Sequence, residues 1–179
     1  MSTSSDHTGI SSADLQARVS ALKAIAVLDT PPEKGFDALT RLAASVCNAP
    51  IAILSLLDGN RVWFKSVHGI DATQIDIAGS FCSECANSKA LLQIANAKAD
   101  PRFSSNDLVT GPLGIQYYAG APIFFDDTPI GTLCVLDYVP RELAEGVLLN
   151  LDDMATIAGV LLSARVEAFK SFSETKTTE

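Results

Sequence analysis

The stretch Pro50-Ile51-Ala52-Ile53-Leu54-Ser55-Leu56-Leu57, followed by Asp58-Gly59-Asn60, decides how the rest of the chain is interpreted. Apolar residues occupy both its odd and its even positions, which is typical of a central strand covered on both faces. Asp58-Gly59-Asn60 is typical of a hairpin turn, so residues 61–67 are predicted to form the partner strand. The hairpin indicates an antiparallel sheet with helices packed on it.

A second strand pair is predicted at 115–125 and 130–136, joined by a turn at Asp126-Asp127-Thr128-Pro129. The region between the two pairs is less regular. It is expected to hold a short helix at 81–90, a short strand at 91–95 and a long structured loop at 100–114. Long loops in compact domains often carry function, so this region is a candidate for a functional site.

Helices are predicted at both ends of the folded part. Ser11 and Asp14 have the spacing of a capping box, and Pro31-Pro32 ends the helix that follows it. A second helix then carries one apolar face: Phe36, Leu39, Ala43 and Val46. The last predicted helix, at about 143–169, has an apolar seam whose members alternate four and three apart: Val147, Leu151, Met154, Ala158 and Leu161. Such a seam either pairs two copies of the chain or covers the chain's own sheet, and we expect a homodimer through the terminal helices.

Composition bounds the domain organisation and the function. The length of 179 residues fits one domain. The formal net charge of -8 argues against binding to nucleic acid or anionic lipid. No secretory segment and no uncharged apolar run of bilayer length is found, so we expect a cytoplasmic protein without membrane contact. We expect a folded domain at 11–170 between a disordered tail at 1–10 and a polar tail at 171–179. Two histidines, His7 and His68, limit haem, zinc and acid–base proposals.

A series of short motifs resembles bacterial GAF sensor domains in content and order. The motifs are Leu28-Asp29-Thr30-Pro31-Pro32-Glu33, Phe36-Asp37, Trp63-Phe64-Lys65-Ser66, Ser80-Phe81-Cys82, Asp100-Pro101-Arg102-Phe103, Tyr118-Ala119-Gly120-Ala121-Pro122, Gly131-Thr132-Leu133-Cys134-Val135-Leu136-Asp137 and Pro140-Arg141. The resemblance covers about residues 18–167. Relatives commonly carry His two residues after the Cys of Ser-Phe-Cys, whereas this chain has Glu84, so no imidazole role transfers to that position.

The resemblance implies an α/β (α+β) fold with a five- or six-stranded antiparallel sheet. It places the N- and C-terminal helices on one face of the sheet and a small-molecule pocket on the other. It also implies a histidine kinase or a cyclase as a possible partner. No catalytic domain follows in this sequence, so we expect a free-standing sensor whose ligand or cofactor is unknown.

The four cysteines are Cys47, Cys82, Cys85 and Cys134. Cys82 and Cys85 have the Cys-x-x-Cys spacing of metal sites and redox pairs, and a helix N-terminus near Cys82 would stabilise a thiolate. Cys134 lies on a predicted central strand and could reach the same pocket, where Glu84 would be a fourth ligand for a metal. A structural zinc site normally shows two such pairs, so we predict no metal site. The alternatives are a reversible Cys82–Cys85 disulfide and buried thiols that act as small hydrophobes.

The candidate ligand-binding residues are completed by aromatic and charged side chains of the motifs: Trp63, Phe81, Phe103, Tyr117, Tyr118, Asp100 and Arg102. Aromatic walls with a few polar groups are typical of small-ligand pockets, although plain core packing explains aromatics equally well. Tyr117 and Tyr118 are adjacent on a strand, so one of the two at most enters the pocket. Arg102 is a candidate clamp for a ligand anion, or it pairs locally with Asp100.

Three functions remain open on the sequence alone. The favoured one is a small-molecule sensor whose ligand lies between the sheet and the middle loops and whose output passes through the terminal helices. The second is a thiol redox sensor, or an enzyme like the methionine-sulfoxide-reducing branch of the GAF family, that uses Cys82, Cys85 and Cys134. The third is a dimerising scaffold with no ligand and no catalytic residues.

Overall fold

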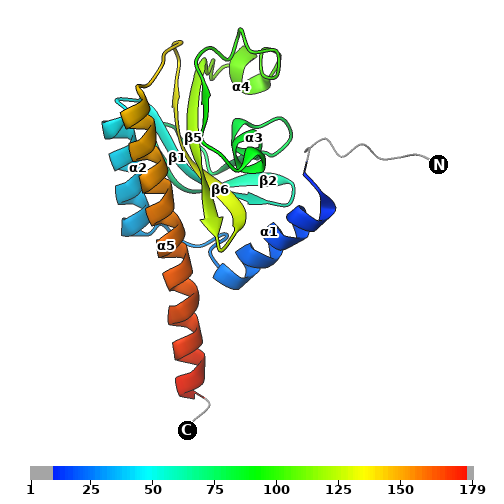
Figure 1. The fold of residues 1–179 in the computed structure, drawn as a ribbon, viewed down its shortest axis with the longest axis vertical. Helices are drawn as coiled ribbons and strands as arrows, with labels where there is room; N and C mark the ends of the chain where they lie inside the picture. The colour runs from blue at the N-terminus through cyan, green and yellow to red at the C-terminus, as the bar shows by residue number, and fades with distance from the viewer. Residues whose placement is uncertain (1–9, 177–179) are drawn as a thin grey trace, which may run out of the picture.

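The computed structural model describes the backbone of residues 10–176 and the side chains of residues 10–168. It contains one six-stranded antiparallel sheet in the order β3-β2-β1-β6-β5-β4 (Figure 1). In chain order the elements are α1 (Ser12–Ile25), α2 (Lys34–Val46), β1 (Ile51–Asp58), β2 (Arg61–His68), β3 (Gln74–Asp76), α3 (Phe81–Ser88), β4 (Leu92–Ile94), α4 (Asp107–Thr110), β5 (Tyr117–Phe125), β6 (Thr128–Asp137) and α5 (Glu145–Lys176).

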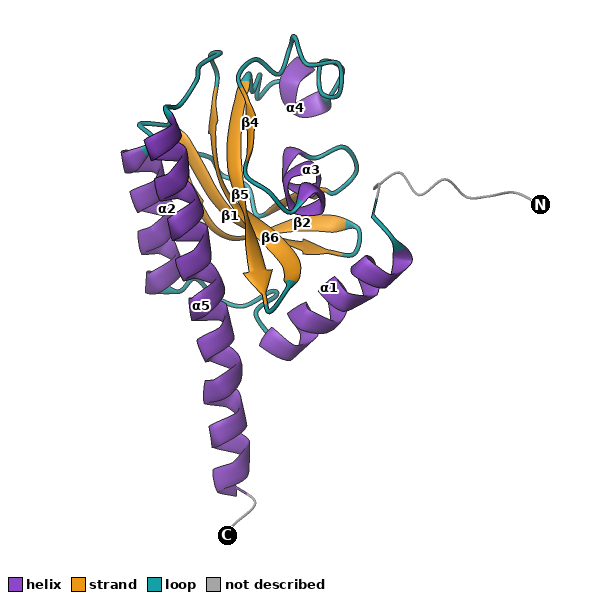
Figure 2. Ribbon diagram, in the orientation of Figure 1, coloured by secondary structure: helices purple, strands orange, loops and turns teal. Residues whose placement is uncertain are grey.

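The sheet separates two apolar layers (Figure 2). Helices α1, α2 and α5 cover one face, while α3, α4 and the loops around them lie over the other. Because successive strand residues point to opposite faces, Leu54 and Leu56 of β1 face the helices and Ile53 and Leu57 face α3. The fold class expected from the sequence, with terminal helices on one face only, is therefore confirmed.

The predicted elements lie close to the observed ones, with two additions and one extension. The predicted Ser11 cap is present, since the Ser11 hydroxyl accepts a hydrogen bond from the Asp14 amide. The Asp14 carboxylate accepts from the Ser11 hydroxyl, where a full capping box would have it accept from the Ser11 amide. β3 and α4 were not expected inside the middle region. α5 continues to Lys176, so residues 171–176 of the expected tail are helical. Residues 1–9 and 177–179 of the expected tails lie outside the described residues.

The apolar seam of α5 packs inward. Leu151, Met154 and Ala158 are buried against the sheet, so this part of the seam covers the chain's own core and is not free to pair with a second copy. Leu161, the last residue of the seam, is exposed, and so are three α5 side chains outside the seam: Leu149, Ile157 and Val160. The window Glu145–Ala168 is long and apolar enough to cross a membrane, with a mean hydropathy of 1.5. The inward face of α5 accounts for the buried part of this stretch, 33% of it.

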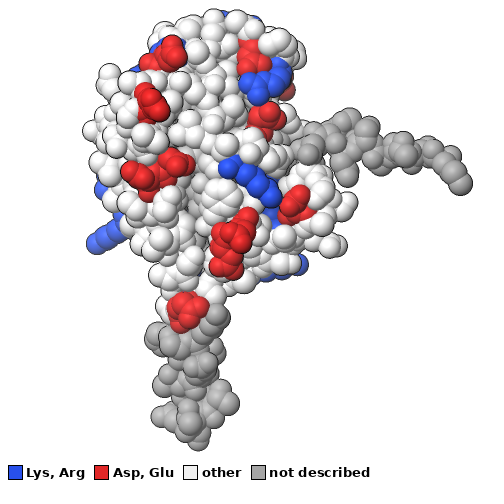
Figure 3. All heavy atoms as spheres, in the orientation of Figure 1, with Lys and Arg blue, Asp and Glu red and all other residues white. Residues whose placement is uncertain are grey.

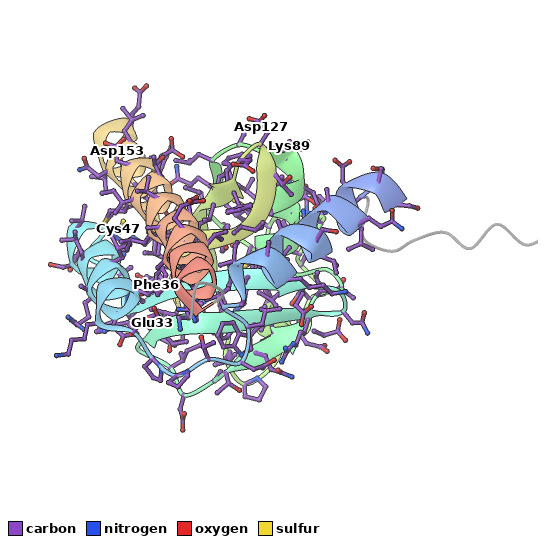
Figure 4. The ribbon with its side chains drawn as sticks, turned by 90° about the horizontal axis from the view of Figure 1, so that it is seen from below. Glu33, Phe36, Cys47, Lys89, Asp127 and Asp153 are labelled. Atoms are coloured by element: carbon purple, nitrogen blue, oxygen red, sulfur yellow. The ribbon has the colours of Figure 1, made fainter. Side chains whose placement is uncertain are left out.

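The segment before α2 is held in place by a buried ammonium group. Lys65 of β2 donates hydrogen bonds to the Thr30 hydroxyl and the Pro31 carbonyl, each at 2.8 Å, and pairs with Glu33 at 2.7 Å. Figure 4 shows Glu33 and Phe36 close to α5, and Arg165 of α5 also pairs with Glu33. The Thr-Pro-Pro-Glu motif therefore joins β2, α2 and α5 around one buried cation.

Candidate ligand-binding site

A cavity of about 50 Å³ lies between the face of the sheet opposite α1, α2 and α5 and the segments around β3, α3 and α4. Its lining is almost wholly apolar: Ile51, Ile53, Phe64, Ile70, Ala72, Ile75, Phe81, Cys82, Leu108, Leu113, Ile115, Tyr118, Cys134 and Leu136. Ile70, Ala72 and Leu108 are half-buried and Leu113 is exposed, so these side chains form the rim. The cavity has the enclosure and the apolar lining of a small-molecule site.

The floor of the cavity follows from strand alternation. Ile51 and Ile53 of β1 lie beside Leu136 and Cys134 of β6, their register partners, and all four point away from the helices. The roof is α3, whose first turn begins at the Ser80 cap. Phe81 of that turn packs on Tyr118 of β5, with ring centroids 5.2 Å apart.

The Tyr118 hydroxyl is a buried polar group that lacks a hydrogen-bond partner in the described part of the chain. It lies over Gly120, where an added Cβ would be 2.2 Å from Oη. Glycine at 120 therefore makes the room that the phenol occupies. Leaving a buried hydroxyl unsatisfied costs about 1–3 kcal/mol. The accessible surface of the cavity is apolar, so this hydroxyl lies behind the cavity wall, against Gly120.

The thiols of Cys82 and Cys134 meet at the inner wall of the cavity, with their Sγ atoms 3.9 Å apart. The Cys134 thiol, followed by the hydroxyls of Thr132, Ser55 and Tyr118, lowers the pKa of Cys82 against the opposing effect of burial. The N-terminus of α3 adds to that effect, because it favours negative charge. The result is a buried thiol that loses its proton more readily than an ordinary cysteine.

Cys85 lies apart from this pair. Its thiol is 3.3 Å from the Gly120 carbonyl and 3.7 Å from the Ala90 carbonyl, and burial raises its pKa to about 12. Cys47 is buried on the helix side of the sheet. Cys82 and Cys85 share α3, but the Cys-x-x-Cys spacing does not make them the close thiol pair. That pair is Cys82 and Cys134.

Trp63 and Tyr117 are placed by the structure in the helix-side core, so they do not line the cavity. The Tyr117 hydroxyl donates a hydrogen bond to Gln93 at 2.7 Å, and the same Gln93 oxygen accepts one from the Leu143 amide. Tyr118, the other member of the adjacent pair, is the tyrosine that enters the cavity. Phe103 does not line it but supports its wall, with its ring 4.6 Å from that of Phe81.

The charged candidates form a surface cluster outside the cavity. Arg102 pairs with Asp100 at 2.7 Å and with Glu84 at 3.1 Å, and about half of its side chain is exposed. The hydrogen bonds from Arg102 hold the pKa of Asp100 below its ordinary value. These contacts match the local ion pair rather than the anion clamp. Among the residues that the structure describes, Glu84 and the thiols do not come together as a group that could hold a metal.

Sequence reasoning missed most of the apolar lining. Ile51, Ile53 and Phe64 were assigned to strands without a face, because both faces of those strands are apolar. Ile70, Ala72 and Leu113 lie in loops that carry no periodic pattern. One signal in the sequence was usable. Cys134 and Leu136 are two residues apart on one strand and therefore share a face, and the same holds for any two residues at that spacing on β1.

The comparisons with known proteins identify the family to which this fold belongs. The model of the GAF domain family matches residues 31–162, and the chain therefore belongs to the GAF domain family. A cyclic di-GMP phosphodiesterase of Pseudomonas aeruginosa is 33% identical over 160 residues, which are 88% of this chain. The chain spans about a quarter (27%) of that relative's length.

Solved structures share the fold at low sequence identity. The GAF domain of PixJ from Thermosynechococcus elongatus, in its blue-light absorbing form, has a TM-score of 0.66 at 13% identity and covers 96% of this chain and 99% of its own. The GAF domain of an Acinetobacter phosphoenolpyruvate-protein phosphotransferase has a TM-score of 0.62 at 15% identity, covering 90% and 97%. The free methionine-R-sulfoxide reductase of Neisseria meningitidis has a TM-score of 0.60 at 16% identity, covering 96% of both chains.

Proposed function

We propose that this GAF domain senses a small, mainly apolar molecule that binds in the cavity beneath α3. The observation that carries the proposal is the cavity itself, whose lining from the sheet, α3 and the loops presents an apolar surface. A small apolar ligand would fill this space.

The size of the cavity indicates that binding moves the segments around it. Pockets for drug-sized ligands occupy about 300–1,000 Å³, whereas this one has about 50 Å³. A ligand larger than a few atoms therefore requires the rim, at Ile70 and Leu113, to move away from the sheet. A ligand shifts an equilibrium between two conformations only when it binds one of them more tightly. A signal therefore requires the ligand to bind the open arrangement of the rim more tightly than the closed one.

Arg18 offers a path from the cavity roof to the terminal helices. This buried α1 residue donates hydrogen bonds to the Asn87 side chain of α3, at 3.0 Å, and to the Pro129 carbonyl, at 2.8 Å. A displacement of α3 would therefore alter how α1 is held against the sheet. In this proposal the terminal helices transmit that change to an output partner.

The proposed output surface is the outer side of α5. Leu149, Ile157 and Val160 are about half exposed or more, and on the face in Figure 3 charged groups stand apart with uncharged surface between them. We propose that this side pairs with a second copy of the chain, as expected for the terminal helices. The relative from Pseudomonas aeruginosa favours a cyclic di-GMP phosphodiesterase as the regulated activity, with a histidine kinase or a cyclase as the other candidates.

Filling the cavity should abolish binding of a small apolar probe. Ala72 lies at the rim, and Ala72→Leu adds three carbon atoms to a space of about 50 Å³. Toluene is the probe. At one hundred times its Kd, mass action stabilises a protein by about 2.7 kcal/mol, which raises Tm by roughly 5–10 °C for a domain of this size. We expect that rise in the wild-type protein and no resolvable rise in Ala72→Leu, measured by calorimetry.

Ala95→Leu is the matched control, because Ala95 is exposed and does not line the cavity. This variant should keep the full toluene-dependent rise. An equal rise in all three proteins would place binding elsewhere and contradict the proposal.

A further inference from the structure

Two thiols from distant parts of the chain meet beside the cavity. Cys82 lies in the first turn of α3 and Cys134 in the middle of β6, and their Sγ atoms are 3.9 Å apart. The Cys134 thiol also lies 3.6 Å from the Ile53 carbonyl, a hydrogen-bond acceptor for its S–H. The pKa of Cys82 is lowered and that of Cys134 is raised, so Cys82 is the first of the pair to lose its proton.

Hydroxyl groups surround Cys82 on the sheet side. Ser55 and Thr132 are register partners on β1 and β6, and their hydroxyls are 2.9 Å apart. Together with the Tyr118 hydroxyl they lower the pKa of Cys82. Among residues 10–168 the Tyr118 hydroxyl has no partner within hydrogen-bond distance, so a small shift toward Cys82 would let it donate to charge or oxygen that develops there.

The cavity brings a small reactant to both sulfur atoms. Cys82 and Cys134 are both lining residues, and the remaining lining excludes bulky or charged molecules. Space for one water molecule requires about 10–15 Å³ on the same measure, so about 50 Å³ admits a reactant the size of hydrogen peroxide. Cys82 is 5% exposed and Cys134 fully buried, so large thiol reagents are kept out.

We propose that Cys82 and Cys134 are a site of reversible oxidation that reacts with small hydroperoxides and closes to a disulfide. This proposal is independent of the ligand proposed above, since it concerns the two thiols and one peroxide.

The chemistry balances in two steps. The Cys82 thiolate attacks one peroxide oxygen, an S–O bond forms as the O–O bond breaks, and the leaving hydroxide takes up the proton lost by Cys82 to give water. The Cys134 sulfur then attacks the sulfenic sulfur, an S–S bond forms as the S–O bond breaks, and the Cys134 proton leaves with the hydroxyl group as a second water. The two thiols lose two electrons, the peroxide gains them, and a dithiol reverses the change by thiol–disulfide exchange.

Closing the disulfide requires the sulfur atoms to approach from 3.9 Å to about 2.0 Å. Rotation of the two side chains and a small shift of α3 toward β6 supply that approach. Cys85, on the same helix, cannot substitute, because its thiol lies against the Gly120 carbonyl.

The test treats the whole chain with a few equivalents of hydrogen peroxide at neutral pH, blocks remaining thiols after denaturation, and maps the peptides by mass spectrometry. We expect the wild-type protein to lose two of its four thiols and to yield one cross-linked peptide pair that contains Cys82 and Cys134, with both thiols restored by dithiothreitol. Cys134→Ser should lose one thiol and, when it is denatured in the presence of dimedone after the peroxide step, give a Cys82 adduct with this trap for sulfenic acid.

Cys82→Ser should keep its three thiols under the same treatment, and Cys85→Ser, the matched control on the same helix, should form the cross-link as the wild type does. Circular dichroism confirms that each variant is folded before the reaction. A Cys82–Cys85 cross-link, loss of the reaction in folded Cys85→Ser, or four unreacted thiols in the wild type would each overturn the proposal.

Discussion

Replacing Gly131 by alanine is expected to lower the free energy of unfolding by about 4 kcal/mol or more. Gly131 lies on β6 beside Leu56 of β1, in the middle of the sheet. A Cβ at this position would be 1.9 Å from the Ser55 carbonyl oxygen, a backbone atom that cannot rotate away. The β1–β6 ladder would have to open, and this ladder carries Ile53 and Cys134 at the cavity floor. Urea unfolding followed by circular dichroism measures the change.

Gly146→Ala provides a control of the same chemistry. Gly146 lies in the first turn of α5, and an added Cβ would meet nothing within 4 Å. Alanine in a helix is favoured over glycine, so this variant should be neutral or more stable by up to about 1 kcal/mol. If Gly131→Ala and Gly146→Ala were equally stable, the added Cβ at residue 131 would be accommodated without cost. That result would contradict the close contact with the Ser55 carbonyl oxygen.

Replacing Lys65 by methionine is expected to be the second largest change, a loss of about 2–4 kcal/mol. The side chain of Lys65 is fully buried, and its ammonium group contacts Thr30, Pro31 and Glu33. Methionine keeps the apolar stem but leaves these oxygen atoms without their donor. Arg165 still pairs with Glu33, so the loss should fall short of that for an isolated buried charge. Thermal and urea unfolding give the measurement.

Lys98→Met is the matched substitution at an exposed lysine, where changes are usually within about 0.5 kcal/mol. If both methionine variants unfold alike, the buried network around Lys65 does not hold the helices to the sheet. A stable Lys65→Met protein would also require another explanation for the Thr-Pro-Pro-Glu motif.

The sequence was sufficient for the elements whose signals are local. The Asp58-Gly59-Asn60 turn and the helix cap at Ser11 each arise from neighbouring residues, and both are present in the structure. β3 and α4 are three and four residues long, too short for a periodic pattern, and tertiary pairing is what stabilises them. They close the cavity, so its rim was hidden from the sequence.

The candidate site was predicted less completely for a related reason. Where a strand is apolar at every position, the sequence does not reveal which residues face the helices. Trp63 was therefore named as a candidate for the pocket, although it faces the helix side of the sheet. The Cys82–Cys134 pair joins residues far apart in the chain, whereas spacing favoured Cys85. Packing decides which face of the sheet an apolar side chain takes and which distant residues meet. Neither outcome leaves a local pattern in a single sequence.

The most direct test of the account is isoleucine methyl spectroscopy during a titration with toluene. Ile51, Ile53, Ile75 and Ile115 line the cavity, while Ile25, Ile123 and Ile130 lie in the helix-side core and act as internal controls. If the cavity beneath α3 is the sensory site, the first set should shift saturably and the second should not. Saturable shifts confined to the helix-side isoleucines, or none in either set, would contradict the central claim.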